Sequence, residues 1–208
     1  MALSPPISAT LVAPLLTRRM ALRAPQSSDL EAMFELHADP VANRFSPSGL
    51  VATREASEAL LAGWLAHWEA EGFGYWAISN RTRPDGEVGD LPSNVVGFGG
   101  VMRRTVDGVS DLYLYFRFRP QAWGQGLASE MALAALKLAF DRLHEQRVLA
   151  VVAPANMPSR KTLERIGLLL KSSLADVPGQ APRLVYEITA ERFATLPKTQ
   201  PAPTPFGA

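Results

Sequence analysis

The strictest alternation of apolar and polar residues in the chain runs from Asp111 to Arg119. A period of two predicts a strand with one buried face. From Leu127 to Leu143 the apolar residues recur at spacings of three and four, which predicts a long, largely buried helix. The segment between them, residues 121–126, contains Gly124 and Gly126. The predicted order is therefore strand, glycine turn and helix.

Weaker patterns of the same kind predict the remaining elements. Helices are expected from Ser27 or Ser28, at 54–71 and at 158–166, and strands at 20–24, 75–79, 94–103, 147–153, 168–174 and 183–189. Hairpins join most of the strands, whereas strand 147–153 follows strand 111–119 through a helix. That crossover makes this one pair parallel. The pattern predicts an α/β domain with a mixed, mostly antiparallel sheet flanked by helices.

The glycine turn is a candidate anion site. The first amides of a helix lack intrahelical partners and lie at the positive end of its dipole, and glycines leave them open to a phosphate. A turn without any ligand would also use glycine, so the hexapeptide alone leaves both readings open. A Walker A loop is excluded because Leu127 and Ala128 follow Gly126. A dinucleotide fingerprint is disfavoured because Ser129 replaces the third glycine and no acidic residue ends strand 147–153.

Two motifs together resemble the GNAT (GCN5-related) N-acetyltransferases. The segment Gln121-x-x-Gly124-x-Gly126, after an aromatic-rich strand, is similar to that family's acyl-CoA pyrophosphate loop. The segment from Asn156 to Leu168, with Ser159 in it, resembles the second motif of the family. Residues 15–23 and the Trp123-Gly124 pair further resemble the RimJ/RimL branch, which acetylates N-termini of ribosomal proteins.

The resemblance implies the GNAT fold, in which two central parallel strands splay apart and acyl-CoA enters the gap. It implies an enzyme that transfers the acetyl group of acetyl-CoA to an amine acceptor by direct attack in a ternary complex, without a metal. A protein or peptide N-terminal α-amine is the leading acceptor. The alternatives are a small-molecule amine, such as an aminoglycoside or polyamine, and a non-catalytic acyl-CoA-binding module.

The resemblance also assigns residues to the cofactor. Strand and turn residues would bind pantetheine and pyrophosphate through their backbone: Phe116, Phe118, Gln121, Trp123, Gly124, Gln125, Gly126 and Leu127. Asn156 would bind pantetheine through its carboxamide. Ser159 would either protonate the leaving thiolate or bind the cofactor, because Leu163 stands where many family members have a tyrosine. Four basic residues are candidates for the adenosine phosphates: Arg117, Arg119, Arg160 and Lys161.

The amine must be uncharged to attack. An α-amine titrates near pH 7.7 to 8.0 and lysine near 10.4, so a carboxylate acting through water suffices for an α-amine. The resemblance makes Asp111 the first candidate for this base, because the RimJ/RimL type usually has an acid at this position at the start of the strand, and Glu187 and Glu130 are weaker candidates.

Composition sets the outer limits. The 208 residues have 47% hydrophobic and 20% charged side chains and a net charge of +1, which is typical of a soluble domain and gives no global attraction to nucleic acid or membrane. Cysteine is absent, and the histidines at 37, 67 and 144 have no metal-ligand spacing. We expect a cytoplasmic protein with one domain at 15–193 and flexible tails at 1–14 and 194–208. The oligomeric state is left open, with a homodimer as one option.

Overall fold

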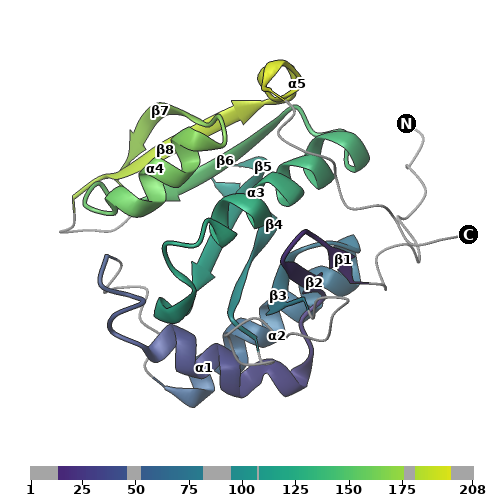
Figure 1. Cartoon of the computed structure of the whole chain (residues 1–208), viewed down its shortest axis with the longest axis vertical. Helices are drawn as coiled ribbons and strands as arrows, with labels where there is room; N and C mark the ends of the chain where they lie inside the picture. Colours follow the sequence, from purple (N-terminus) through teal and green to yellow (C-terminus); the bar gives the residue numbers. More distant parts are fainter. Residues whose placement is uncertain (1–13, 46–52, 82–94, 107, 176–180, 198–208) are drawn as a thin grey trace, which may run out of the picture.

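The structure is a computed structural model that describes residues 14–45, 53–81, 95–106, 108–175 and 181–197. An eight-stranded sheet crosses the molecule in the order β1-β2-β3-β4-β5-β6-β8-β7 (Figure 1). Its strands are β1 (Leu15–Leu16), β2 (Met20–Arg23), β3 (Tyr75–Asn80), β4 (Gly97–Val106), β5 (Val109–Phe118), β6 (Arg147–Val152), β7 (Leu169–Leu174) and β8 (Arg183–Thr189). Neighbouring strands are antiparallel except β5 and β6, which are parallel.

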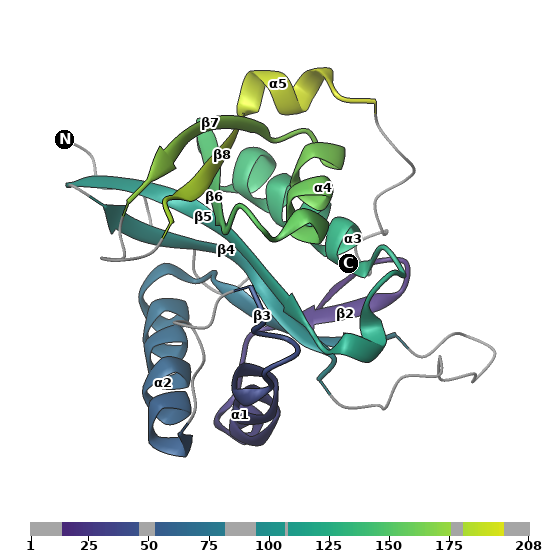
Figure 2. The ribbon, with the colours of Figure 1, turned by 90° about the vertical axis from the view of Figure 1, so that its left-hand side faces the viewer.

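Helices cover both faces of the sheet. They are η1 (Ser27–Asp29), α1 (Leu30–Ala38), α2 (Arg54–Glu71), η3 (Pro120–Ala122), α3 (Leu127–Lys137), η4 (Leu138–Arg142), α4 (Met157–Arg165) and α5 (Ala190–Thr195). Figure 2 shows α1 and α2 on one side of the sheet and α3, α4 and α5 on the other. The domain is thus a three-layer arrangement, as the mixed α/β pattern predicted.

Each face of the sheet has its own apolar core. On the α3 face, Met131 and Leu136 of α3 pack with Leu112 of β5 and Val148 of β6. On the α1–α2 face, Trp64 of α2 belongs to a second cluster with residues of α1, β3 and β4. Helices α2 and α3 therefore bury their apolar stripes against opposite faces of the sheet, where these side chains are removed from water.

Strand β5 contributes to both cores because its side chains alternate. Leu112, Leu114 and Phe118 lie in the core on the α3 face. Tyr115 packs against the cluster on the α1–α2 face. The alternation predicted from the sequence is confirmed, and it assigns the odd-numbered residues of β5 to the side of α1 and α2.

Strands β5 and β6 separate after a short contact. Their only paired positions in the described chain are Leu112 with Val148 and Tyr113 with Leu149, while β5 pairs with β4 at ten positions. Beyond Tyr113, residues 114–118 present an edge that is not paired with β6. This is the splayed parallel pair expected of the GNAT fold.

The long predicted helix at 127–143 is divided in the structure. An α-helix ends at Lys137 and a π-helical segment, η4, completes it to Arg142. The amide of Leu143 accordingly donates to the carbonyl of Leu138 at 3.0 Å, five residues back. The spacing of the apolar residues predicted where the helix begins and ends. It could not distinguish α-helical from π-helical hydrogen bonding.

Other differences lie at the ends of elements. Instead of a serine cap, Asp29 accepts a hydrogen bond of 2.7 Å from the amide of Gln26, and α1 begins at Leu30. The short elements β1, η3 and α5 were not predicted, and α5 extends past the expected domain end at 193. The segment between the expected strands 75–79 and 94–103 and the expected tails at 1–14 and 194–208 lie mostly outside the described residues.

Candidate active site

The glycine turn leads from β5 into α3 and exposes its backbone. Gly124 and Gly126 have φ angles of 75° and 74°, a left-handed conformation that favours glycine. In the part of the chain that the structure describes, no backbone hydrogen bond engages the amides of Gly124, Gln125 or Gly126. Together with the free first amides of α3, they form a cradle suited to a pyrophosphate.

One amide assigned to this cradle has an internal partner. The Trp123 amide donates to the carbonyl of Pro120 at 3.1 Å, within the η3 turn. The Trp123 indole donates to the Phe118 carbonyl at 2.8 Å, and the guanidinium of Arg44 lies 4.9 Å from its ring. Trp123 therefore anchors the turn to the end of β5.

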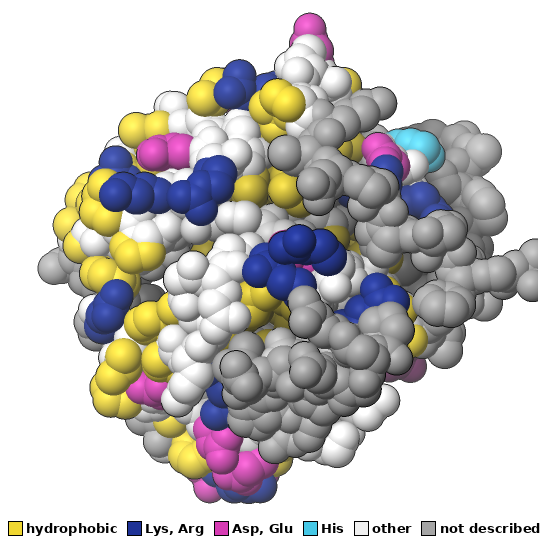
Figure 3. Space-filling view, in the orientation of Figure 1, with side chains coloured by type: hydrophobic (Ala, Val, Ile, Leu, Met, Phe, Trp, Pro, Cys, Tyr) yellow, Lys and Arg dark blue, Asp and Glu magenta, His cyan; other side chains and the backbone are white. Residues whose placement is uncertain are grey.

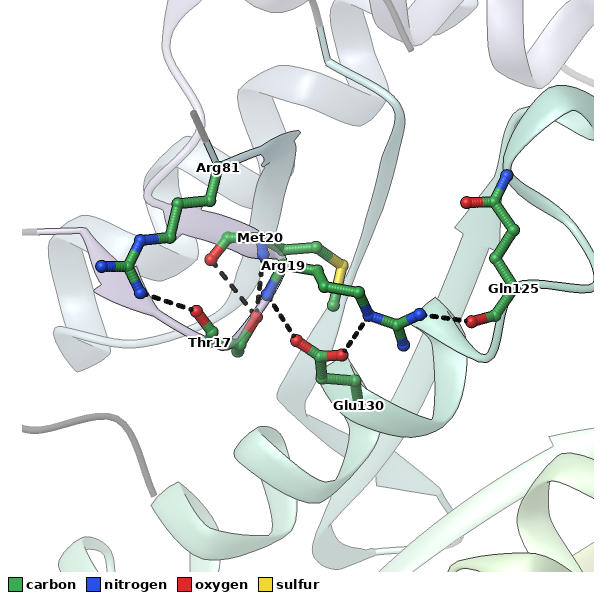
Figure 4. A network of polar contacts seen from close by, with 6 residues as sticks. All are labelled: Thr17, Arg19, Met20, Arg81, Gln125 and Glu130. Carbon is green, nitrogen blue, oxygen red and sulfur yellow. Dashed lines mark hydrogen bonds and ion pairs between the residues drawn. The ribbon is translucent and has the colours of Figure 1, made fainter. Parts of the chain in front are cut away.

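Arg19 holds the turn from the opposite end of the sequence (Figure 4). Its Nη1 donates to the Gln125 carbonyl at 2.6 Å, and its Nε donates to Glu130 Oε2 at 2.7 Å. The Arg19 amide donates to the other carboxylate oxygen of Glu130 at 2.9 Å. Burial alone would raise the pKa of Glu130, but hydrogen bonds from Thr17 and Arg19 lower it. Glu130, a weaker candidate for the base, is thus a fixed anchor of the turn.

The second motif forms the start of α4. Asn156 is the N-cap, and its Oδ1 accepts from the Ser159 amide at 3.2 Å. Ser159 is half-buried, and among the described residues nothing hydrogen-bonds its hydroxyl. Leu163 is 2% exposed and lies in the core on the α3 face. The hydroxyl of Ser159 is therefore available to a ligand, whereas Leu163 supplies no acid.

A hollow of about 300 Å³ lies on the α1–α2 face, next to the splayed part of β5. Its lining comes from α1, α2 and the three strands β3, β4 and β5: His37, Leu60, Trp64, Tyr75, Met102, Arg104, Tyr115 and Arg117. A second hollow, of about 210 Å³, lies at β7 and β8. The first hollow shares strand β5 with the glycine turn and with the separation of β5 from β6.

His37 and Tyr115 form a hydrogen-bonded pair in this hollow. The Nδ1 of His37 lies 2.9 Å from the carbonyl of Met33, so it carries a proton, and Nε2 accepts from the Tyr115 hydroxyl at 2.9 Å. Burial and then the charge of Arg117 lower the pKa of His37 to about 4. Burial raises the pKa of Tyr115. Both side chains are therefore neutral near pH 7.

The candidate base Asp111 lies at the closed end of the splay. Its oxygens accept from Arg147 Nε and Nη2 at 2.7 and 2.8 Å, which ties β5 to β6. Arg147 also lies 3.7 Å from Glu187, whose other oxygen is 3.3 Å from Lys171. Two base candidates, Asp111 and Glu187, are thus joined by one row of ion pairs. By strand alternation Asp111 is on the same face as Tyr115 and the hollow.

The four basic candidates for the adenosine phosphates are not brought together. Arg117 donates to the side-chain oxygen of Asn43, and Arg119 pairs with Glu35 of α1 at 2.6 Å. Arg160, on α4, donates to the Tyr186 hydroxyl at 3.2 Å. Lys161 is exposed on the same helix. Of the four, only Arg160 and Lys161, both on α4, lie on the side of the sheet that holds α3.

Sequence reasoning missed three site residues. No pattern in the sequence marks Arg104, and for His37 the sequence excludes only a metal-ligand spacing. Arg19 belongs to residues 15–23, for which only a resemblance was noted. No local pattern marked Arg19, which contacts a carbonyl 106 residues away.

The described residues contain no cluster of three or more side chains able to hold a metal ion. Of the helices in the described ranges, none combines the length and apolar character that a membrane span requires. Figure 3 shows Lys and Arg side chains in several groups on one face, including a group at its centre.

Comparisons with known proteins place this geometry in a family. A family model described as an acetyltransferase (GNAT) domain matches residues 19–169. The uncharacterized N-acetyltransferase YnaD of Bacillus subtilis is 23% identical over 163 residues, which cover 73% of this chain and 80% of that protein. The family match spans well over half of the chain and includes both motifs.

Solved structures share the fold. RimJ of Mycobacterium smegmatis, in complex with CoA-disulfide, matches with a TM-score of 0.63 and 21% identity over 86% of this chain and 87% of its own. The ribosomal-protein-S5-alanine acetyltransferase of Vibrio fischeri has a TM-score of 0.64 and 13% identity, with coverages of 87% and 98%. Spermidine N-acetyltransferase of Vibrio cholerae, in complex with CoA and spermine, matches with a TM-score of 0.65 and 14% identity. The match covers 84% of this chain and 98% of that chain. The chain belongs to the GNAT family and is an acetyltransferase.

Proposed function

We propose that this enzyme transfers the acetyl group of acetyl-CoA to the N-terminal α-amine of a protein or peptide. The observation that supports the donor is the separation of β5 from β6 beside a turn whose amides are free. Pyrophosphate binds the turn, and the pantetheine arm adds to the free edge of β5 in the manner of an extra strand. Phe116 and Phe118 supply backbone to that edge, and Asn156 contributes its carboxamide.

The acceptor enters from the other face, through the hollow at α1 and α2. No described side chain that lines it is a carboxylate, which disfavours a polyamine because its several positive charges would have no partners. An α-amine is largely deprotonated near pH 8 and needs little help from a base. Asp111, whose carboxylate accepts hydrogen bonds from Arg147, is the base we propose, acting through water. Ser159 is the proposed donor of a proton to the leaving thiolate.

Release of CoA thiol and the mass of the product test this function. The acceptors are one peptide with a free N-terminus, the same peptide with a blocked N-terminus, spermidine and an aminoglycoside. We expect turnover only with the free N-terminus, and a mass increase of one acetyl group on the α-amine. Turnover with spermidine and not with the peptide would replace the proposed acceptor with a small-molecule amine.

Asp111→Asn and Ser159→Ala separate the proposed roles. If Asp111 is the base, its variant lowers kcat by about 10²-fold while the protein stays folded. If Asp111 serves only to join β5 to β6, thermal stability falls and kcat is retained.

For Ser159→Ala, we expect kcat to fall more than the affinity for CoA. An unchanged kcat would remove Ser159 from the chemistry.

A further inference from the structure

The hollow on the α1–α2 face is unusual in its charge. It is lined by two arginines, Arg104 from β4 and Arg117 from β5, and by no described carboxylate. The rest of the lining is apolar, aromatic or neutral, including His37, whose lowered pKa keeps it uncharged near pH 7. The hollow is therefore positively charged at neutral pH.

Arginines beside these two are neutralised by acidic partners. Arg103 pairs with Glu71 and Glu145, and Arg119 pairs with Glu35. Within the described residues, neither Arg104 nor Arg117 has a carboxylate in ion-pair distance. The hollow is thus lined by two guanidiniums whose charge no acidic side chain of the described residues pairs with.

The contacts of the two guanidiniums orient them without neutralising them. Arg104 lies 5.0 Å from the centre of the Tyr113 ring, and Arg117 lies 5.8 Å from that of Tyr115 while donating to the neutral side chain of Asn43. A guanidinium stacked on an aromatic face keeps its edge N–H groups free, and those groups match a carboxylate.

We propose that the hollow binds a carboxylate of the acceptor, carried by an acidic side chain within the first residues of the peptide whose α-amine is acetylated. This inference rests on the proposed function. It adds a preference that the family fold does not specify. Arg104 faces Asp111 and Arg117 faces Phe98 in the β4–β5 register, so the backbones of the two arginines are about 20 Å apart. They line opposite ends of the hollow, and one carboxylate contacts one arginine at a time.

Binding measured without turnover tests the preference directly. Isothermal titration uses the protein saturated with CoA and three peptides identical except at the second residue, which is glutamate, glutamine or lysine. A charge-assisted hydrogen bond to a carboxylate predicts a Kd about tenfold lower for the glutamate peptide than for the glutamine peptide. The lysine peptide should bind more weakly than either.

Arginine variants locate the contact. Arg104→Gln or Arg117→Gln should bring the glutamate and glutamine peptides to nearly equal Kd, with little change for the glutamine peptide. Arg142→Gln is the control, because Arg142 is an exposed arginine of η4 outside the hollow. Circular dichroism and CoA affinity establish that each variant is folded. Equal affinity of the wild-type protein for all three peptides would overturn the inference, as would a preference for glutamate that persists in both variants.

Turnover assays distinguish this inference from the proposed function. Acetylation of all the peptides without preference for glutamate would leave the proposed function intact and refute the carboxylate site. A glutamate preference in binding, lost in an arginine variant, supports the site even if no peptide is acetylated, and the proposed acceptor would then be wrong. Free glutamate and aspartate are added as acceptors. If these amino acids are acetylated and Arg104→Gln loses that activity, the carboxylate site is retained. Its ligand would then be the carboxylate of a free amino acid rather than of a peptide side chain.

Discussion

At the scale of single residues, His37 determines how the hollow responds to acid. Its pKa of about 4 in the folded protein is below the ordinary value near 6.5, because burial and Arg117 disfavour the charged ring. As pH falls from about 6.5 to 4, the unfolded chain gains this proton and the folded one does not. Folding therefore loses stability over that window, by up to about 3 kcal/mol.

Replacement of His37 by glutamine tests this prediction. Glutamine can still accept from the Tyr115 hydroxyl but does not titrate in this range. Denaturant unfolding of both proteins at pH 7 and pH 4.5 should show that the wild type loses about 2 kcal/mol more than His37→Gln. Equal losses in the two proteins would mean that His37 is protonated as readily in the folded state as in the unfolded one.

A candidate site residue could be predicted from the sequence when the residues that it contacts lie close to it along the chain. The glycines of the turn and the Asn156–Ser159 motif are local patterns, so they could be identified directly. Arg19 and Arg104 act through contacts made only when distant segments meet. Arg19 reaches Gln125 across 106 residues, and Arg104 lines a hollow formed by five elements. One sequence gives no information about such contacts.

At the scale of elements, the backbone conformation of the turn before α3 matters for the binding of pyrophosphate that we propose. Gly124 has a φ of 75°, and no atom lies within 4 Å of the position that a Cβ would occupy. Gly108, in the β4–β5 hairpin, has a φ of 77° and equally open surroundings. Alanine at either position costs about 1 kcal/mol of stability through backbone strain alone. Only at Gly124 should the strain also displace amides that bind pyrophosphate.

The pair Gly124→Ala and Gly108→Ala therefore separates the two effects. Both variants should lose similar stability in denaturant unfolding, while Gly124→Ala alone raises the Kd for CoA, by about tenfold. Titration calorimetry with CoA measures the second quantity. Equal CoA affinity in the two variants would show that the geometry of the turn at Gly124 does not matter for the cofactor.

The elements themselves were predicted with uneven success, and the physical reason is clear at particular places. Strand β5 and helix α2 follow strong periodic patterns, so both were found with bounds accurate to two residues or better. Helix α5 has six residues, too few for a period to be detected. Helical structure before α1 begins instead with η1, whose N-cap is Gln26 and whose Asp29 carboxylate accepts from the Gln26 amide.

At the scale of the whole molecule, the sheet consists of two parts with a narrow connection. Strands β1 to β5 form one part and β6, β8 and β7 the other, and within the described residues two register pairs join β5 to β6. The Asp111–Arg147 ion pair reinforces the joint at its closed end. At the open end, backbone groups of β5 and β6 face the gap, where they can bond to a ligand. A cofactor in the gap would therefore link the two parts.

Hydrogen exchange tests that consequence. We expect CoA to slow the exchange of amides that face the gap, in residues 114–118 of β5 and 150–152 of β6, because bonding to the pantetheine arm replaces bonding to water. The paired residues Leu112 and Val148 should change little, since they already bond across the joint. Protection restricted to the glycine turn and the first turn of α3 would contradict the prediction. It would mean that the protein holds the pyrophosphate while the arm lies outside the sheet, and then the separation of β5 from β6 would have no role in binding the donor.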